Sequence, residues 1–585
     1  MTLIENLNQS LKEAFEKAGY DPAFAKVTLS NRPDLCEFQC NGAMALAKQA
    51  HKAPIKIAEE IVACIPENGP FQAFSAVAPG FINLSLSEAY LAGFLRSMAD
   101  SDRLGAALPE KKTVMVDYGG ANVAKPLHIG HLRSAIIGEA IKRLMRFMGH
   151  DAIGDTHLGD WGTQFGLIIE ELRERKPDLC YFDESFTGEY PEEAPFTLKE
   201  LEEIYPAASA KSKVDEAFKE RALKTTYDMQ MGNKAYRALW KHINEVSLPD
   251  LKRNYDALNV SFELWKAESD AAPYIPAMIQ DLKDQGIAYV SEGALVVDVQ
   301  EEGDSRELPP CLIQKSDGAS LYATTDLATL VWRMQDYHPD RIIYLADKRQ
   351  ELHYTSFFRV ARKGGIVEPD TGLDFIGFGT MNGKDGKPFK TRAGGVMRLE
   401  ALISEINEAV LDKMKERYAE DELDDETVKM VGLAAIKYGD LSNQATKDYN
   451  FDIERFASFE GNTGPYILYT IVRIKSILRK AGKEDLTSDL LSDLPEGNVS
   501  LKSLMKQLAA FPEMIENTAE ELAPHRICSF IYQVSDAFNS FYHDTQILKE
   551  EDEKVRNAYL MLLSLTRRVL ETCIDILGFE APEKM

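Results

Sequence analysis

The stretch from residue 113 to residue 148 constrains the fold of this chain more than any other. An apolar, β-rich run at Thr113–Tyr118 is followed by two glycines and the loop Ala121–Arg133, and a helical pattern then covers Ser134–Met148. In α/β proteins, a strand, a glycine-containing loop and a helix in this order place a nucleotide beyond the carboxyl end of the strand. The sequence therefore predicts a Rossmann-like parallel sheet with a nucleotide site after this strand.

The loop before the helix carries polar donors. His128 and His131 are three residues apart and are expected on one face of the first helical turn, with Gly130 between them leaving the backbone accessible to a base or ribose. Lys125 adds a positive charge beside a helix N-terminus, which already favours anions. These residues can bind a phosphate, but the stretch offers no obvious nucleophile. The pattern His-x-Gly-His alone also arises by chance and in unrelated nucleotidyltransferases.

Length and composition limit the other possibilities. A chain of 585 residues is too long for one core and indicates about three or four domains. The net charge of −26 argues against indiscriminate nucleic-acid binding, but it allows an RNA partner held by local basic patches. The seven cysteines form no Cys-x-x-Cys pair, so we expect reduced thiols and no metal site. Without a secretory signal or a long apolar run, we expect a cytoplasmic protein that does not enter membranes.

Three runs resemble one known family. The segment 122–134, which reads Asn-Val-Ala-Lys-Pro-Leu-His-Ile-Gly-His-Leu-Arg-Ser, resembles arginyl-tRNA synthetases, and its His-Ile-Gly-His core is similar to class I aminoacyl-tRNA synthetases in general. Segments 31–48 and 157–166 resemble the same family. The resemblance implies an arginine–tRNA ligase that uses ATP, with Mg²⁺ on the triphosphate, to charge tRNA(Arg) through an arginyl adenylate. It also implies that activation waits for tRNA, and we expect a monomer.

The resemblance covers nearly the whole chain and implies a multidomain α/β architecture. We expect a small α/β N-terminal domain at 1–108 that recognises the tRNA corner at the D-loop, and a Rossmann-like catalytic domain at 113–395 with a helical insertion at about 168–290. A helical connection at 396–446 would lead to an all-helical anticodon-binding bundle at 447–585.

Periodicity predicts the individual elements of this architecture. Helices are expected at 4–18, 43–50 and 55–65, strands at 71–76, 81–84, 294–299, 341–345 and 375–379, a turn into a helix at 321–333, and helices alone in 396–585.

The arginine pocket should contain paired acids, because a guanidinium presents a planar fork to two acceptors. By resemblance, Asp117, Tyr322 and Asp326 contact the substrate side chain. Asn122 and Gln350 would hold its α-amino and carboxylate ends. From the residues alone, Asp326 could instead be the N-cap of a helix.

The glycine-flanked basic loop at 383–395 lies where class I enzymes carry Lys-Met-Ser-Lys-Ser. The match is degenerate, because Thr391 stands in the place of the usual second lysine. By resemblance, Lys390 and Arg392 act on the triphosphate together with Lys125 and the two histidines, and Lys125 is the expected substitute for the missing lysine. An ordinary flexible surface loop is the alternative.

Two groups of residues are candidates for tRNA binding. In the N-terminal domain, Asn68, Phe71 and Gln72 could stack on and read an unpaired base, although a turn followed by a core phenylalanine is slightly favoured. In the C-terminal bundle, Tyr542 and Met585 fall where the family places anticodon contacts. A local basic strip there, equally consistent with a solvated helix face, consists of Arg473, Lys475, Arg479 and Lys480.

Two other functions remain open at this point. A small-molecule nucleotidyltransferase could use the same His-x-Gly-His chemistry, but it would have no use for the flanking domains. A catalytically silent tRNA-binding paralogue could keep those domains, but it would usually lose a histidine or a pocket carboxylate, and here all are present.

Overall fold

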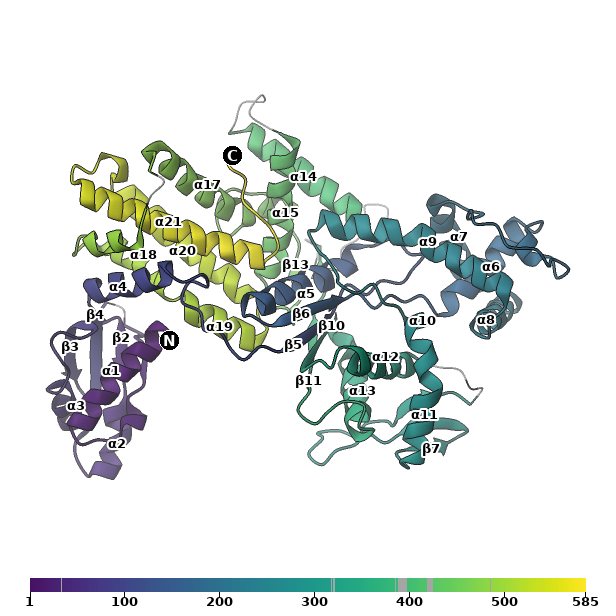
Figure 1. Ribbon diagram of the computed structural model, residues 1–585, viewed down its shortest axis with the longest axis horizontal. Helices are drawn as coiled ribbons and strands as arrows, with labels where there is room; N and C mark the ends of the chain where they lie inside the picture. The colour runs from purple at the N-terminus through teal and green to yellow at the C-terminus, as the bar shows by residue number, and fades with distance from the viewer. Residues whose placement is uncertain are drawn as a thin grey trace. The chain divides into compact units, whose positions relative to one another are not determined.

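The computed structural model describes residues 1–32, 34–316, 318, 321–383, 386–387, 397–417, 424–483 and 486–585. The chain forms two compact units (Figure 1). One consists of Met1–Pro109, Lys413–Tyr438 and Ala457–Met585, and the other of Glu110–Asp412 and Gly439–Phe456. None of the described helices is both long and apolar enough to cross a membrane.

The second unit is built on a four-stranded parallel sheet with the order β11-β10-β5-β6. Its strands are β5 (Thr113–Asp117), β6 (Asp151–Asp155), β10 (Arg341–Asp347) and β11 (Gly372–Phe378). Thr113 pairs with Asp151 in β6, and Arg341 pairs with Val114 in β5 and with Gly372 in β11. The chain runs outward from β5 in one direction and from β10 in the other, so the strand order reverses between these two strands. Open α/β sheets bind their ligands at such a reversal, and the predicted Rossmann-like core is confirmed.

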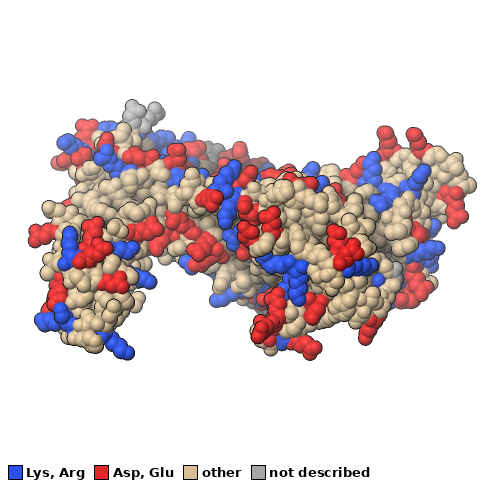
Figure 2. All heavy atoms as spheres, turned by 60° about the horizontal axis from the view of Figure 1, so that its bottom comes forward, with Lys and Arg blue, Asp and Glu red and all other residues tan. Residues whose placement is uncertain are grey.

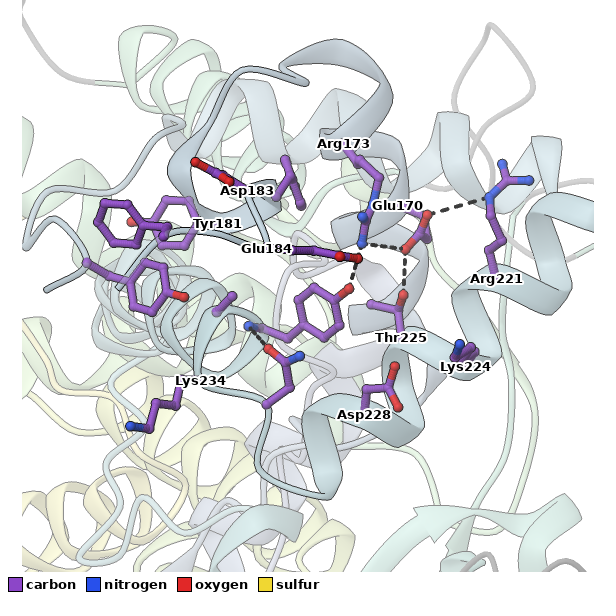
Figure 3. A pocket seen from close by; sticks show the side chains of 16 residues that line it. Glu170, Arg173, Tyr181, Asp183, Glu184, Arg221, Lys224, Thr225, Asp228 and Lys234 are labelled. Carbon is purple, nitrogen blue, oxygen red and sulfur yellow. Dashed lines mark hydrogen bonds and ion pairs between the residues drawn. The ribbon is translucent and has the colours of Figure 1, made fainter. Parts of the chain in front are cut away.

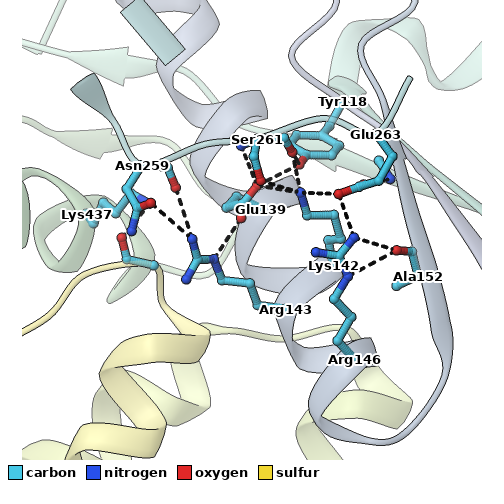
Figure 4. A network of polar contacts seen from close by, with 12 residues as sticks. Tyr118, Glu139, Lys142, Arg143, Arg146, Ala152, Asn259, Ser261, Glu263 and Lys437 are labelled. Atoms are coloured by element: carbon cyan, nitrogen blue, oxygen red, sulfur yellow. Dashed lines mark hydrogen bonds and ion pairs between the residues drawn. The ribbon is translucent and has the colours of Figure 1, made fainter. Parts of the chain in front are cut away.

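Helix α5 (Ile129–Phe147) follows β5 and packs against β5, β6 and β10. It begins five residues earlier than the periodicity indicates, because the side chain of His128 caps its first turn. Side chains of α5 form a network of polar contacts with the segment 259–263 (Figure 4). Buried Lys142 lies 3.0 Å from buried Glu139, which also accepts a hydrogen bond from the Tyr118 hydroxyl at 2.7 Å. This network fixes the helix that carries the histidine pair.

The insertion between β6 and β10 is mostly helical. It contains α6 (Thr163–Arg175), η2 (Cys180–Phe182), α7 (Leu198–Lys211), α8 (Glu216–Gln230), α9 (Lys234–Ala257), α10 (Glu268–Ala271), η3 (Ala272–Tyr274) and α11 (Ile275–Asp284). A small antiparallel sheet then follows, with β7 (Ala288–Ser291), β8 (Ala294–Val297) and β9 (Cys311–Gln314). The sequence predicts only the strand that became β8 in this sheet. The core resumes with α12 (Tyr322–Asp336), η4 (Lys348–Gln350) and α13 (Glu351–Lys363).

The first unit begins with the predicted small α/β domain, which the structure confirms. Its antiparallel sheet has the order β1-β2-β4-β3. The elements are α1 (Leu3–Lys17), η1 (Pro22–Phe24), β1 (Val27–Leu29), β2 (Phe38–Cys40), α2 (Gly42–Ala50), α3 (Pro54–Val62), β3 (Phe71–Val77), β4 (Phe81–Leu86) and α4 (Glu88–Ala99). The short strands β1 and β2 were not predicted.

The rest of the chain after residue 396 is almost entirely helical. The helices are α14 (Leu399–Lys415), α15 (Asp425–Leu441), α16 (Ile453–Phe456), α17 (Gly464–Ala481), η6 (Ser488–Asp493), α18 (Val499–Ala509), α19 (Phe511–Glu521), α20 (His525–Asp544), η7 (Ile547–Lys549) and α21 (Glu553–Ile576). One prediction fails here, because β13 (Tyr449–Asn450) is a strand that pairs in parallel with β12 (Met381–Asn382). Two residues carry no periodicity that a sequence pattern could detect.

Acidic and basic side chains are interspersed over the surface drawn in Figure 2. With a net charge of −26, contacts with a polyanion therefore depend on local groups of Lys and Arg and not on the charge of the whole chain.

Candidate active site

His128 and His131 form the N-terminal cap of α5. Nδ1 of His128 accepts a hydrogen bond from the N–H of Gly130 at 3.0 Å, and Nδ1 of His131 accepts one from the N–H of His128 at 3.1 Å. The two ring centroids are 4.0 Å apart. A neutral imidazole that accepts at Nδ1 carries its proton on Nε2. Each ring is therefore held as an Nε2–H donor.

Both imidazoles are neutral at physiological pH. Burial and the neighbouring His128 lower the pKa of His131 to about 3. Burial and then the charge of Lys125 lower the pKa of His128. The pair can therefore donate hydrogen bonds to a phosphate but adds no positive charge, which must come from another side chain.

Lys125 provides a cation three residues before His128. Its Nζ lies 4.8 Å from the centroid of the Tyr205 ring in α7. Gly130 is exposed in the first turn of α5, as a backbone contact with a nucleotide requires. Lys390, Thr391 and Arg392 lie outside the described residues.

The chain that follows the predicted phosphate loop returns to the histidine pair. The N–H of Ile129 donates to the carbonyl of Met397 at 3.0 Å, and the N–H of Leu399 donates to the carbonyl of Leu127 at 3.0 Å. Arg398 thus forms an antiparallel bridge with His128. The chain at 397–399 therefore lies beside the histidines, although the two segments are far apart in the sequence.

Asp326 lies in the second turn of α12. Its Oδ2 is 2.6 Å from Nε2 of His353 in α13. The alternative that Asp326 is a helix N-cap is wrong, because Leu321 holds that position. Tyr322, the first residue of the same helix, is 74% exposed. Asn122, in the loop after β5, and Gln350, at the end of η4, are both exposed.

Asp117 has a partner within the protein. Its Oδ2 accepts a hydrogen bond at 2.6 Å from Nη2 of Arg333, and the same Nη2 reaches Oδ2 of Asp155 at 2.6 Å. Arg333 and Asp155 are fully buried. Burial raises the pKa of Asp117, against the attraction of Arg333. The resemblance assigns Asp117 to the substrate guanidinium, whereas in this structure one of its oxygens already bonds a guanidinium of the chain itself.

Glu268, at the start of α10, interacts electrostatically with Asp326 but was not found from the sequence. Burial raises its pKa to about 7, with nearby His157 opposing the shift and with Asp326 and Asp160 adding to it. Burial also raises the pKa of Asp160 to about 6, although Ser269 donates to it from Oγ at 2.6 Å. These acids form a site suited to a cation. No sequence motif indicates Glu268, because its burial and its acidic neighbours arise only when α10 packs against the loop 157–161.

The three N-terminal candidates for tRNA binding differ in their exposure. Asn68 and Gln72 are exposed, whereas Phe71 is 1% exposed at the start of β3. A buried ring offers no face to a base, so the core reading of Phe71 is correct and its stacking role is not supported by this structure.

The C-terminal candidates meet at one cavity. A cavity of about 760 Å³ is lined by Tyr542 and Met585 and by three members of the basic strip, Arg473, Arg479 and Lys480. The guanidinium carbon of Arg473 lies 5.4 Å from the ring centroid of Tyr542. Lys475 does not share this role, because it is buried and its Nζ forms an ion pair with Glu583 at 2.7 Å.

The insertion contains a further hollow of about 660 Å³, drawn in Figure 3. Arg173 donates to the hydroxyl of Tyr236 at 2.7 Å, and the Thr225 hydroxyl bonds Glu170. Acidic and basic groups are mixed around it, and it contains none of the site residues predicted from the sequence. Among the residues that the structure describes, no group of three or more His, Cys, Asp or Glu side chains could hold a metal ion.

Comparison with known proteins identifies first the class and then the family of the chain. Residues 95–453 match the family described as "tRNA synthetases class I (R), catalytic domain". Residues 1–86 match "Arginyl tRNA synthetase N terminal domain", and residues 467–585 match "DALR anticodon binding domain". The fold is thus that of a class I aminoacyl-tRNA synthetase.

Individual relatives narrow the assignment. The chain is 59% identical to an arginine–tRNA ligase of Agathobacter rectalis and 53% identical to one of Alkaliphilus oremlandii, with 100% of each chain covered. An arginyl-tRNA synthetase structure from Plasmodium falciparum has a TM-score of 0.81 at 26% identity and covers 100% of this chain and 99% of its own. The chain belongs to the arginyl-tRNA synthetase family. This assignment removes the unrelated nucleotidyltransferase as an alternative.

Proposed function

We propose that the chain ligates L-arginine to tRNA(Arg), with ATP converted to AMP and diphosphate. In the first step, the arginine carboxylate attacks the α-phosphate of ATP and diphosphate leaves. In the second step, the arginyl group passes from the adenylate to the 3′-terminal adenosine of the tRNA. Neither step needs a covalent bond to the protein, which agrees with a site that offers donors and no nucleophile.

The observation that carries this proposal is the pairing of two neutral imidazoles at the N-terminus of α5. Negative charge builds on the phosphate oxygens in the transition state, where fixed donors are most effective. The Nε2–H groups of His128 and His131 are such donors, and the helix N-terminus adds its partial positive charge. Lys125, Lys390 and Arg392 would supply the full charges.

The acidic pocket supports arginine as the amino acid. We assign the guanidinium to Asp326 and Glu268, which act electrostatically on one another across the pocket. Tyr322 would close over the side chain, and Asn122 and Gln350 would bind the α-amino and carboxylate groups. Asp117 binds Arg333 through one oxygen, and we assign its second oxygen to the substrate side.

For the tRNA, we assign the anticodon to the cavity that contains Tyr542 and Met585. Arg473 can bind a phosphate there while Tyr542 stacks on a base. Asn68 and Gln72 are the exposed candidates for the D-loop. Replacing Tyr542 with Ala should raise the KM for tRNA and leave the KM for arginine unchanged.

Three further properties belong to the proposal. Mg²⁺ would be bound by triphosphate oxygens and water, because Lys125 and the histidines are donors and not ligands for a hard cation. All seven cysteines are free thiols, which fits a reducing cytoplasm. We propose a monomer, which light scattering at assay concentrations would test.

The direct experiment is an aminoacylation assay with radiolabelled amino acids and purified tRNA. Arginine should be attached to tRNA(Arg) in an ATP-dependent reaction, whereas lysine, which cannot form a bidentate pair with carboxylates, should not. Binding of tRNA without charging by any amino acid would instead identify a silent paralogue.

A further inference from the structure

Side chains of helix α7 in the insertion contact two residues beside the histidine pair, Lys125 and Arg398. Tyr205 lies under the ammonium group of Lys125, with Nζ 4.8 Å from the ring centroid. One turn earlier, Glu202 forms a two-pronged ion pair with Arg398, at 3.1 Å and 3.0 Å. Lys125 precedes His128, and Arg398 forms the backbone bridge with it. One short helix face therefore holds the two flanks of one nucleotide-binding segment.

We propose that α7 is a positioning element for the nucleotide site, in which Tyr205 holds the Lys125 ammonium beside the histidine pair and Glu202 keeps the helix in register through Arg398. This proposal rests on the proposed function and adds residues to it. Tyr205 and Glu202 touch no reacting atom; they act through Lys125 and Arg398.

The geometry favours positioning over a purely structural role. A cation within about 6 Å of an aromatic centroid is attracted to the ring face but keeps its N–H groups for other partners. Lys125 on the ring can therefore still donate to a phosphate. Its charge also lowers the pKa of His128, after the larger effect of burial, so the ammonium lies near the imidazoles while it rests on Tyr205.

The ion pair supplies the register. The Glu202 side chain is 17% exposed and Arg398 is 52% exposed. A cavity of about 300 Å³ beside the pair is lined by residues of α7, α9 and the segment that starts α14. The Glu202–Arg398 pair is thus a described link between α7 and the chain at 397–399, on a side of α7 that borders a cavity. It adds to the packing of α7 on α6 and sets the place of Tyr205 relative to Lys125.

A double-mutant cycle on Lys125 and Tyr205 tests the proposal. We expect Tyr205→Leu to lower kcat for arginine-dependent ATP–diphosphate exchange, measured with tRNA, by about fivefold, since an exposed cation–π contact is of that strength. Tyr205→Phe keeps the ring and should retain wild-type kcat. In a Lys125→Ala background, Tyr205→Leu should have no further effect. The KM for arginine should not change.

Matched variants separate positioning from general damage. Tyr227, exposed on α8, provides the control Tyr227→Leu, which should be silent. Glu202→Gln should lower kcat by about threefold, and Glu203→Gln, at the exposed neighbouring position, should not. Additive losses in the cycle, or equal losses for Tyr205→Phe and Tyr205→Leu, would overturn the proposal, because a ring that only stabilises the fold gives those results.

The same double-mutant cycle can also be measured by ligand binding, without enzymatic turnover. Equilibrium ATP binding to the four proteins of the cycle should show the same coupling, with Tyr205→Leu weakening ATP only when Lys125 is present. Wild-type protein without exchange would refute the proposed function but leave this binding test in force. Wild-type exchange with no coupling in either measurement would refute the positioning role alone.

Discussion

Nε2 of His353 lies 2.6 Å from Oδ2 of Asp326, so the imidazole bonds one side of the carboxylate while the other side stays available to a ligand. The contact links α13 to α12 and holds Asp326 in one rotamer. A carboxylate fixed in this way is prepared to bind one end of a planar guanidinium.

Replacement of Asp326 with Asn should weaken arginine binding selectively. The loss of a charge-assisted partner of a desolvated guanidinium costs about 3 kcal/mol, which raises the KM for arginine about a hundredfold. The KM for ATP should stay within twofold. Asp336→Asn, at an exposed position on the same helix, is the control and should have no effect. An unchanged kcat/KM for arginine in Asp326→Asn would remove this residue from the pocket.

Arginine binding should depend on pH through Glu268. Its pKa of about 7 means that the carboxyl is largely protonated at pH 6 and largely ionised at pH 8. A guanidinium binds the ionised form, so arginine affinity should rise by about tenfold from pH 6 to pH 8 and then level off. The neutral His131, whose pKa is about 3, cannot cause a change in this range.

Calorimetry in two buffers of different ionisation enthalpy measures this effect directly. Near pH 7, binding of arginine should release a fraction of a proton, and Glu268→Gln should remove most of the release, leaving only the small part due to Asp160, whose pKa is about 6. Equal proton release in the variant would assign the titration to another group.

Sequence patterns predicted those elements whose structure is decided by neighbouring residues in the chain. The strand before His128 and the helix after it are coded by adjacent residues, and both were predicted, although the cap at His128 starts the helix five residues earlier than periodicity indicates. Glu268 was missed because its raised pKa results from burial against a distant loop. The internal Arg333–Asp117 bond was missed for the same reason, since nothing near Arg333 in the sequence indicates that its guanidinium reaches β5. For Phe71, the sequence allowed both a core ring and a ring that stacks on a base, and only the exposure of the side chain in the structure distinguishes the two.

Arg333 should contribute mainly to stability. It neutralises the buried Asp155 and the partly buried Asp117, so Arg333→Met leaves both carboxylates without a cation, at a cost of about 3–5 kcal/mol. For Arg333→Met, we expect a clear fall in the urea concentration at which half of the second unit, Glu110–Asp412 with Gly439–Phe456, is unfolded. Arg341→Met breaks the partly exposed pair with Asp374 and should cost about 0–1 kcal/mol. Similar midpoints for the two variants would mean that Arg333 is not the neutralising group.

Lys125 should stabilise charge on the leaving diphosphate, because the usual second lysine of the loop is replaced by Thr391. Lys125→Ala should lower kcat for adenylate formation by about 10²–10³. Thr391→Lys, at a position outside the described residues, should partly restore activity to that variant. If Lys125→Ala instead leaves kcat intact and raises only the KM for tRNA, with a weaker salt dependence, Lys125 is a tRNA phosphate contact.

The central claim is that this chain activates arginine at the histidine pair in a reaction coupled to tRNA. It is tested most directly by ATP–diphosphate exchange with arginine, measured with and without tRNA(Arg). We predict exchange only when arginine and tRNA are both present, and its loss when His128 and His131 are both replaced with Asn. Arginine-dependent exchange without RNA would contradict the coupling, and an absence of arginine-dependent exchange under every condition would contradict the function itself.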